Sequence, residues 1–378
     1  MAAPTTGSWQ CVGMGDGGMN ETWAQISDLA FEAALAGYVV ALVCYAIELA
    51  GKRTAEPTAA GAGRQRSAAV GAGVTSTLTK TGGFAAGTDR DQIGVVNRPA
   101  SSLAVRFGQA AVVVTAVGAA ANVLSVVARG LAVGRLPLGN MYEFVSVICA
   151  VTAICWLIVL AKTGARTLGT FVMLPVVVLA LVAGTKLYVP AAPVVPALNS
   201  YWKWIHVTTI AISSSILLVS GAASVLFLIR GRLERKELAT LAAGRAAGQP
   251  VDVLGAGDGR GGRTRVGSLL TVLPTTATLD RIAYRTAIVG FPLFTFAVIA
   301  GAMWAEVAWG RYWGWDPKET CAFITWVFYA AYLHARSTAG WRGRRAAWIS
   351  VLGFASMLFN LFFINMVVSG LHSYAGLN

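Results

Sequence analysis

Eight apolar stretches alternate with polar or basic segments along the 378 residues of this chain. Most of them are long enough, as helices rising about 1.5 Å per residue, to cross about 30 Å of membrane hydrocarbon. In lipid only helices and closed barrels satisfy their backbone hydrogen bonds, and no stretch alternates with period two. The pattern therefore predicts an all-α, polytopic membrane protein with about eight transmembrane helices. The predicted helices are Leu29–Leu49, Phe107–Ala128, Phe144–Ala161, Leu168–Thr185, Ile205–Ile229, Thr286–Met303, Thr320–Ala335 and Ala346–Leu371.

Composition and charge agree with this class. The chain is 56% hydrophobic and only 12% charged, whereas a soluble domain carries about 25% charged residues. The net charge of +13 would suit a nucleic-acid-binding protein, but the basic residues lie between the apolar stretches, where they set membrane topology. With the N-terminus outside, 24 of the 30 lysines and arginines fall on the inner side. We therefore expect a plasma-membrane protein with both termini outside, no cleavable signal peptide and no nucleic-acid partner.

The polar segments complete the predicted organisation. Its parts are an outer segment at 1–28, the first helix at 29–49, an inner basic loop at 50–106, helices two to five at 107–229, a second inner basic loop at 230–285, and a core at 286–378. Within the inner loops, 52–98 and 235–265 are rich in small and charged residues without an apolar period, which predicts disorder. A short amphipathic helix on the inner surface is predicted over Leu273–Arg285.

The segment 304–319, WAEVAWGRYWGWDPKE, holds four tryptophans between the sixth and seventh predicted helices. Trp304, Trp309, Trp313 and Trp315 can each be explained as residues of the aromatic belt, because indole rings prefer the membrane–water boundary. Asp316 before Pro317 is typical of a helix start. Four tryptophans among glycines and charges also suggest a flat apolar surface at the outer boundary, which would suit a flat ligand with a charged rim, such as haem.

Only three histidines occur in the chain, and ionisable residues near membrane spans tend to be functional. The predicted topology puts His206 and His372 at the outer level of the tryptophans, so the pair can supply both axial ligands of one haem iron. His334 follows Thr320 by 14 residues and lies about 21 Å deeper by helical rise, near the inner surface. Taken singly, each histidine can equally be a hydrogen-bonded boundary residue.

Charged residues near the outer histidines would complete such a ligand site. Arg311, Lys203 and Lys318 are candidate partners for haem propionates. The five cysteines form no CxxC pair, so no metal site is predicted apart from iron held through haem.

These residues match a known family. WGRYWGWDPKE resembles the "WWD" signature of haem-handling proteins of cytochrome c maturation, and the chain is most similar to the CcsA-type (ResC-type) subunit of the two-subunit haem delivery and ligation system. Four further segments, RLPLGNMYEF, NSYWKWIH, YLHAR and SGLHSYAG, are also similar to that subunit. The resemblance runs from about residue 105 to the C-terminus.

The resemblance implies that His206 and His372 ligate an outer haem b, bound as substrate, lying on the four tryptophans and Asp316. It implies that His334 ligates haem nearer the cytoplasm, with a CcsB/ResB-type membrane subunit supplying the second ligand. The implied reaction joins haem vinyl groups to the thiols of CxxCH in an apocytochrome c, with a thiol-reducing thioredoxin-like protein as a further partner. This chain would then be part of a holocytochrome c synthase. No catalytic acid or base is identified, and Glu306 and Asp316 are only candidates.

Three alternatives remain open at this stage. The "WWD" signature is shared by haem exporters and lyases of a different maturation system. A membrane b-type electron carrier would normally need two histidine pairs at two depths, which three histidines cannot supply. A solute transporter would show internal repeats or broken helices, for which Pro175 and Pro292 are weak indications.

Overall fold

The computed structural model describes residues 20–54, 102–191, 200–246, 270, 272–364 and 368. Every regular element in these ranges is helical, and no strand occurs in them, which confirms the predicted all-α class. The helices are α1 (Glu21–Thr54), α2 (Ser102–Val133), α3 (Met141–Thr163), the 3-10 helix η2 (Arg166–Leu168), α4 (Gly169–Lys186), α5 (Tyr201–Ala246), α7 (Thr276–Trp309), α8 (Pro317–Ser337), α9 (Arg344–Phe359) and the π-helix η4 (Asn360–Ile364).

Seven of the described helices are long and apolar enough to cross a membrane. They are α1, α2, α3, α4, α5, α7 and α9, the last counted together with η4. The remaining long helix, α8, has 21 residues and runs beside its neighbours in the bundle, but polar side chains lie near both of its ends. This chain is therefore a multi-pass membrane protein.

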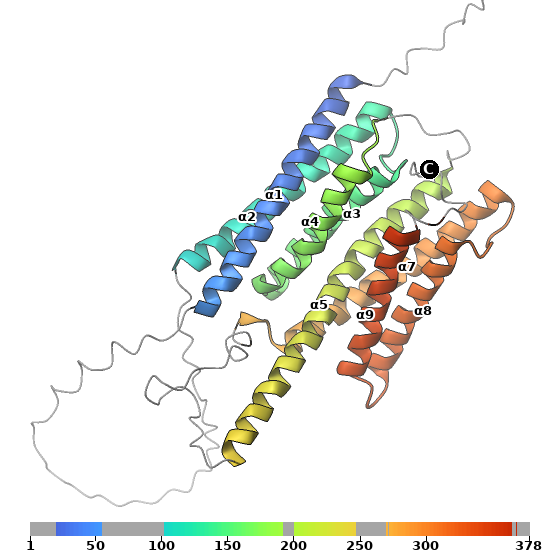
Figure 1. Cartoon of the computed structure of the whole chain (residues 1–378). Coiled ribbons are helices and arrows are strands. Elements are labelled where there is room, and N and C mark those ends of the chain that lie inside the picture. The colour runs from blue at the N-terminus through green and yellow to red at the C-terminus, as the bar shows by residue number, and fades with distance from the viewer. Residues whose placement is uncertain are drawn as a thin grey trace, which may run out of the picture.

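The helices form one elongated bundle in which α5 is the longest and most central element (Figure 1). The helix α1 packs along α2, α5 along α7, and α8 along α9. Because α5 also contacts α3 and α9, it joins the N-terminal helices to the C-terminal ones. Polar side chains bond between helices in the first half, including Asn122 to the Tyr38 hydroxyl at 3.2 Å and Trp156 to the Tyr45 hydroxyl at 3.2 Å.

Several predicted boundaries differ from the structure. The helix α5 continues to Ala246, so the disorder predicted at 235–246 is wrong, while 247–265 lies outside the described residues. The separate surface helix predicted over Leu273–Arg285 is also wrong, because Thr275 caps a single helix, α7, that runs unbroken to Trp309. No proline occurs in α7 before Pro292, so the charged first turns simply continue into the span. The other predicted disordered stretch lies outside the described residues beyond Thr54.

Candidate functional site

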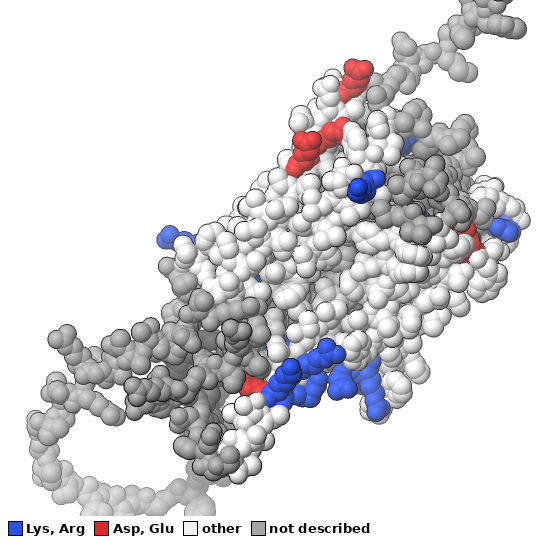
Figure 2. Space-filling view, in the orientation of Figure 1, with Lys and Arg blue, Asp and Glu red and all other residues white. Residues whose placement is uncertain are grey.

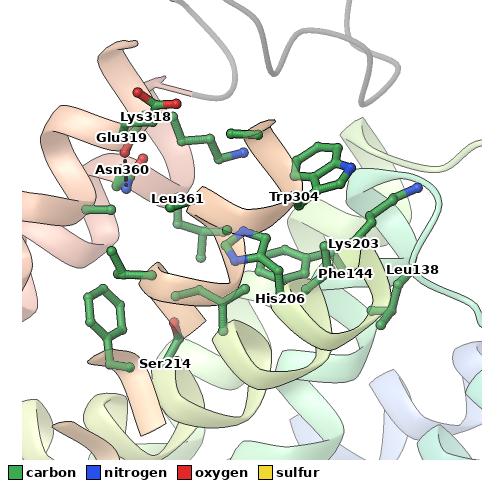
Figure 3. Close-up of a pocket in the computed structure, with 18 of the residues that line it drawn as sticks. Leu138, Phe144, Lys203, His206, Ser214, Trp304, Lys318, Glu319, Asn360 and Leu361 are labelled. Carbon is green, nitrogen blue, oxygen red and sulfur yellow. Dashed lines mark hydrogen bonds between the residues drawn. The ribbon is translucent and has the colours of Figure 1, made fainter. Parts of the chain in front are cut away.

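A pocket opens at the end of the bundle where α7 ends and α8 begins (Figure 3). Its walls come from the loop before α3, the first turns of α3, α5, α7, α8, and the junction of α9 with η4. Its empty volume is about 1260 Å³, which includes open space at the mouth. The lining is largely apolar, as in most sites for small molecules and cofactors. Its apolar members include Met141, Phe144, Val207, Ile210, Phe294, Val298, Ala302, Met357 and Leu361.

His206 reaches this pocket from the second turn of α5. Its Nδ1 lies 2.7 Å from the backbone oxygen of Ala297 on α7. A carbonyl oxygen can only accept, so Nδ1 carries the proton and, in the neutral ring, Nε2 carries the lone pair. Gly301 makes room for the ring, because a Cβ there would lie 2.7 Å from both Cε1 and Nδ1 of His206. This is the arrangement in which a histidine is oriented through one nitrogen to ligate a metal through the other.

The tryptophans at the end of α7 support His206. The Trp304 side chain is 1% exposed, and its ring is nearly parallel to the His206 ring, inclined by 19° with centroids 6.2 Å apart. Trp309 follows at 5.2 Å from Trp304, with the two rings inclined by 55°. Both tryptophans line the pocket, so this end of α7 forms one of its walls.

The other two tryptophans have different positions. Trp313 lines the pocket, while Trp315 is 66% exposed and meets Trp313 edge to face at 86°. Trp315 is also the one described residue other than glycine with a positive φ, 56°, a conformation that is strained for a bulky side chain. The four rings therefore do not form the single flat surface that the sequence suggested; three line the pocket and the fourth lies outside it.

The start of α8 is fixed by the predicted cap. Asp316 accepts from the backbone N–H of Lys318 at 3.2 Å, and the Glu319 carboxylate accepts from the N–H of Gly314 at 2.9 Å and of Asp316 at 3.2 Å. With Pro317 in the first turn, this is a complete capping box, which confirms the predicted capping role of Asp316. Asp316 itself is buried and does not line the pocket.

Two lysines line the pocket, and in Figure 3 His206 lies between them. The Lys203 side chain is 2% exposed, and its Nζ has no hydrogen-bond partner among the residues that the structure describes. The Lys203 Nζ lies over the Trp204 ring, 4.8 Å from its centroid. Burial lowers the pKa of Lys318, which lies just before the apolar run of α8, to about 8, and the nearby Asp316 carboxylate opposes this shift. A buried ammonium group such as that of Lys203 favours an anionic ligand.

The remaining predicted residues are not part of the pocket. Arg311 is exposed and folds against Gly314, where a Cβ would lie 2.6 Å from its Cζ. Glu306 is exposed on α7. His334 is exposed near the opposite end of α8, so the structure separates it from His206. His372 lies outside the described residues.

Sequence reasoning assigned no role to several lining residues. Leu138, Gly139 and Asn140 come from the loop before α3, and Asn360 from the π-helix. The RLPLGNMYEF segment was a usable signal for the first three, since it is a polar, glycine-containing loop at the level of the tryptophans. Asn360 has no such signal in the sequence, although short π-helices often occur at functional sites.

Comparison with known proteins shows the family to which this chain is similar. The family model described as "Cytochrome C assembly protein" matches residues 138–372. The protein named "Cytochrome c biogenesis protein CcsA" is 38% identical over 264 residues in Synechococcus elongatus, covering 65% of this chain and 81% of that protein. Its namesake in Gloeobacter violaceus is 36% identical over 281 residues, covering 66% and 82%, and that in Porphyra purpurea is 36% identical over 283 residues, covering 67% and 83%.

A solved structure named "Cytochrome c Heme Lyase CcmF" has a similar fold, with a TM-score of 0.54 at 16% sequence identity. The likeness covers 93% of this chain and 48% of that one, so this chain spans about half of its length. The family match covers the loop before α3, the pocket and α8, and the CcsA proteins share more than a third of their aligned residues with this chain. This chain is therefore a member of the cytochrome c assembly protein family, of the CcsA type.

Proposed function

We propose that the pocket holds haem b as a substrate for covalent attachment to an apocytochrome c, with His206 as an axial ligand. The observation that carries this proposal is the orientation of His206, whose Nδ1 is tied to the Ala297 oxygen while its ring lies along Trp304. The apolar walls suit the porphyrin, and the buried Lys203 ammonium suits a propionate.

Other expected contacts extend this proposal. His372 would be the second axial ligand of the outer haem, and Trp309 and Trp313 would contact the macrocycle or its edge. Trp315, which lies outside the pocket, would support the site through its edge-to-face contact with Trp313. Lys318 would pair with the other propionate. The Arg311 side chain would have to move away from Gly314 to contact a propionate. Asp316 would act by holding the start of α8 in place.

In the proposed reaction each haem vinyl group adds one thiol of a CxxCH motif and forms a thioether. The chain's own residues would bind the haem, fix its orientation and keep water from it. Glu306 and Asp316 do not line the pocket, so neither carboxylate is placed to act as a base there. The chain would thus be the haem-holding part of a holocytochrome c synthase.

A second haem position near the inner surface is part of the proposal. The exposed side chain of His334 would ligate haem there, with a CcsB/ResB-type membrane subunit donating the other ligand. A thioredoxin-like protein would keep the apocytochrome thiols reduced. The proposed orientation places the tryptophan segment outside the plasma membrane. Figure 2 supports it, because Lys and Arg gather at the end of the bundle opposite to the pocket, as inner-side residues do.

The axial-ligand proposal is tested with His206→Ala in the full chain in nanodiscs. We expect bound haem to fall or its spectrum to lose bis-histidine character, and added imidazole to restore it. Thr209→Ala is the matched control on the same helix, because the Thr209 hydroxyl bonds to the Ile205 oxygen of that helix and Thr209 does not line the pocket. An unchanged spectrum in His206→Ala would remove the assignment.

Two further measurements separate the alternatives. Thioether formation on a CxxCH peptide distinguishes a synthase subunit from an electron carrier or a transporter. Cysteines introduced at the exposed Leu136 and Trp341, which lie at opposite ends of the bundle, report the orientation. An impermeant reagent should label Leu136→Cys from outside and leave Trp341→Cys unlabelled.

A further inference from the structure

Four charged side chains meet beside the pocket, and the proposed chemistry does not use them. Glu143, on the first turn of α3, is almost fully buried, as is Arg129 near the end of α2. The Glu143 carboxylate lies 3.3 Å from Nε of Arg129 and 2.9 Å from Nη1 of Arg135. Asp28 on α1 completes the group, 3.4 Å from Nη1 of Arg129. Two cations and two anions make this cluster neutral.

Glu143 is the centre of the cluster because it accepts from several donors. Arg135 gives it two hydrogen bonds, at 2.9 and 3.1 Å, through the planar fork that only arginine has. The backbone N–H of Gly139 donates to the same carboxylate at 2.6 Å. A side chain at Gly139 would displace the Arg135 guanidinium, since a Cβ there would lie 2.6 Å from Nη2 of Arg135. Asn140 closes the turn by accepting from the N–H of Glu143 at 2.9 Å.

These bonds fix the loop that forms one wall of the pocket. Leu138, Gly139, Asn140 and Met141 all line it. Other bonds of the loop are local: the Arg135 N–H donates to the Gly130 oxygen at 3.2 Å, the Leu138 N–H to the Leu136 oxygen at 2.9 Å, and Nη1 of Arg135 to the Leu136 oxygen at 3.0 Å. Without the carboxylate, the Arg135 side chain and the Gly139 N–H would lose their bonds to α3, and the loop would lose its link through Glu143 to Arg129.

The cluster also reaches helices that precede the region matched by the family model. Arg129 donates to the backbone oxygen of Val189, after α4, and its Cζ lies 5.0 Å from the Tyr142 ring centroid. The Tyr188 hydroxyl lies 2.7 Å from the Asp28 carboxylate. The matched region starts at residue 138, so α1 and α2 meet it here through Asp28 and Arg129.

We infer that Glu143 is a positioning residue for the ligand in the pocket. It holds the 135–141 loop, through Arg135 and Gly139, in the shape that closes one wall over the haem. Through Arg129 it ties that wall to α1 and α2, so the N-terminal helix pair belongs to the site. The inference rests on the proposed function, because haem is the ligand whose retention it explains.

A positioning role and a purely electrostatic role predict opposite results. Glu143→Gln adds one net positive charge beside Lys203, so electrostatics alone would make the pocket hold an anionic porphyrin longer. Arg135→Lys leaves the net charge unchanged but removes the two-pronged contact. If Glu143 and Arg135 act by positioning, both variants should lose haem faster despite their different charges.

The experiment uses the full chain in nanodiscs, loaded with haem, and follows haem transfer to an excess of haem-free myoglobin. We expect Glu143→Gln and Arg135→Lys to release haem roughly ten- to a hundredfold faster than the parent, as for a site whose geometry is loosened. Glu32→Gln, the same change at an exposed position on α1, should match the parent. A nitroxide on Leu136→Cys, read without haem, should become more mobile in both loop variants and unchanged in the control.

Slower haem release in Glu143→Gln, or parent-like release in Arg135→Lys, would overturn the inference. A nitroxide that is no more mobile in the two variants than in the parent would also overturn the inference. Because the nitroxide is read without haem, this holds even for a variant that binds no haem. If the parent chain itself binds no haem, the proposed function is wrong, and the nitroxide still decides whether Glu143 fixes the loop.

Discussion

Gly301→Ala should displace the ring of His206, the candidate axial ligand, while leaving the histidine itself in place. A Cβ at position 301 would lie 2.7 Å from Cε1 and Nδ1 of His206, while ordinary contact begins at 3.4 Å. The ring must therefore move away from α7 by about 0.7 Å, since backbone and ring are both stiff. That movement stretches the 2.7 Å bond from Nδ1 to the Ala297 oxygen, because Ala297 lies on the same helix one turn earlier.

The size of the effect follows from what this bond does. The direct contribution of this hydrogen bond to stability is about 1 kcal/mol. Alanine in place of glycine stabilises a helix by about 1 kcal/mol, so the free energy of unfolding should change little. The orientation of a metal-ligating histidine by its second nitrogen typically contributes ten- to a hundredfold in affinity. We therefore expect haem affinity to fall by roughly that factor while Tm stays within a few degrees.

The assay is haem titration of the full chain in nanodiscs, followed by absorbance, together with thermal unfolding without haem. Gly231→Ala is the matched control, because its new Cβ would lie 3.6 Å from Nη1 of Arg235, an ordinary contact, on the same helix as His206. Haem affinity in Gly301→Ala equal to that of the parent would refute the reasoning, and so would an equal loss in Gly231→Ala.

Four further outcomes are expected. Lys203→Met should raise the Tm without haem, because a buried ammonium is removed, and should lower haem affinity about tenfold, whereas the exposed Lys186→Met should do neither. Haem affinity should decline as the pH rises above about 8, because Lys318 of the free protein then loses its proton and no longer attracts a propionate carboxylate. In Lys318→Met, haem affinity should change less with pH above about 8. His334→Ala should abolish cytochrome c maturation while the two subunits still co-purify, and normal maturation in this variant would exclude the inner site. Asp316→Ala should cost about 1 kcal/mol of stability through the lost cap, and Asp316→Ser should restore both stability and maturation if capping is its whole role.

The sequence by itself determined the class of this protein and much of its local structure. Long apolar runs, basic segments and low charge predict a helical membrane bundle, because lipid leaves the backbone no other arrangement. The start of α8 was equally predictable, since a cap needs only Asp316, Pro317 and Glu319, which are neighbours in the chain. The predicted boundaries failed where charged turns continue a helix, as in α5 beyond Ile229 and at the start of α7.

Only the tertiary structure decided how the site is built. The Ala297 oxygen and Gly301, which orient His206, follow it by more than 90 residues, and no local pattern shows that they face it. The tilt of the tryptophan rings and the bonds from Glu143 to the loop at 135–139 likewise depend on how helices are rotated against one another. A sequence period gives the apolar face of a helix, whereas the residue that meets a given side chain across an interface is set by packing of the whole bundle.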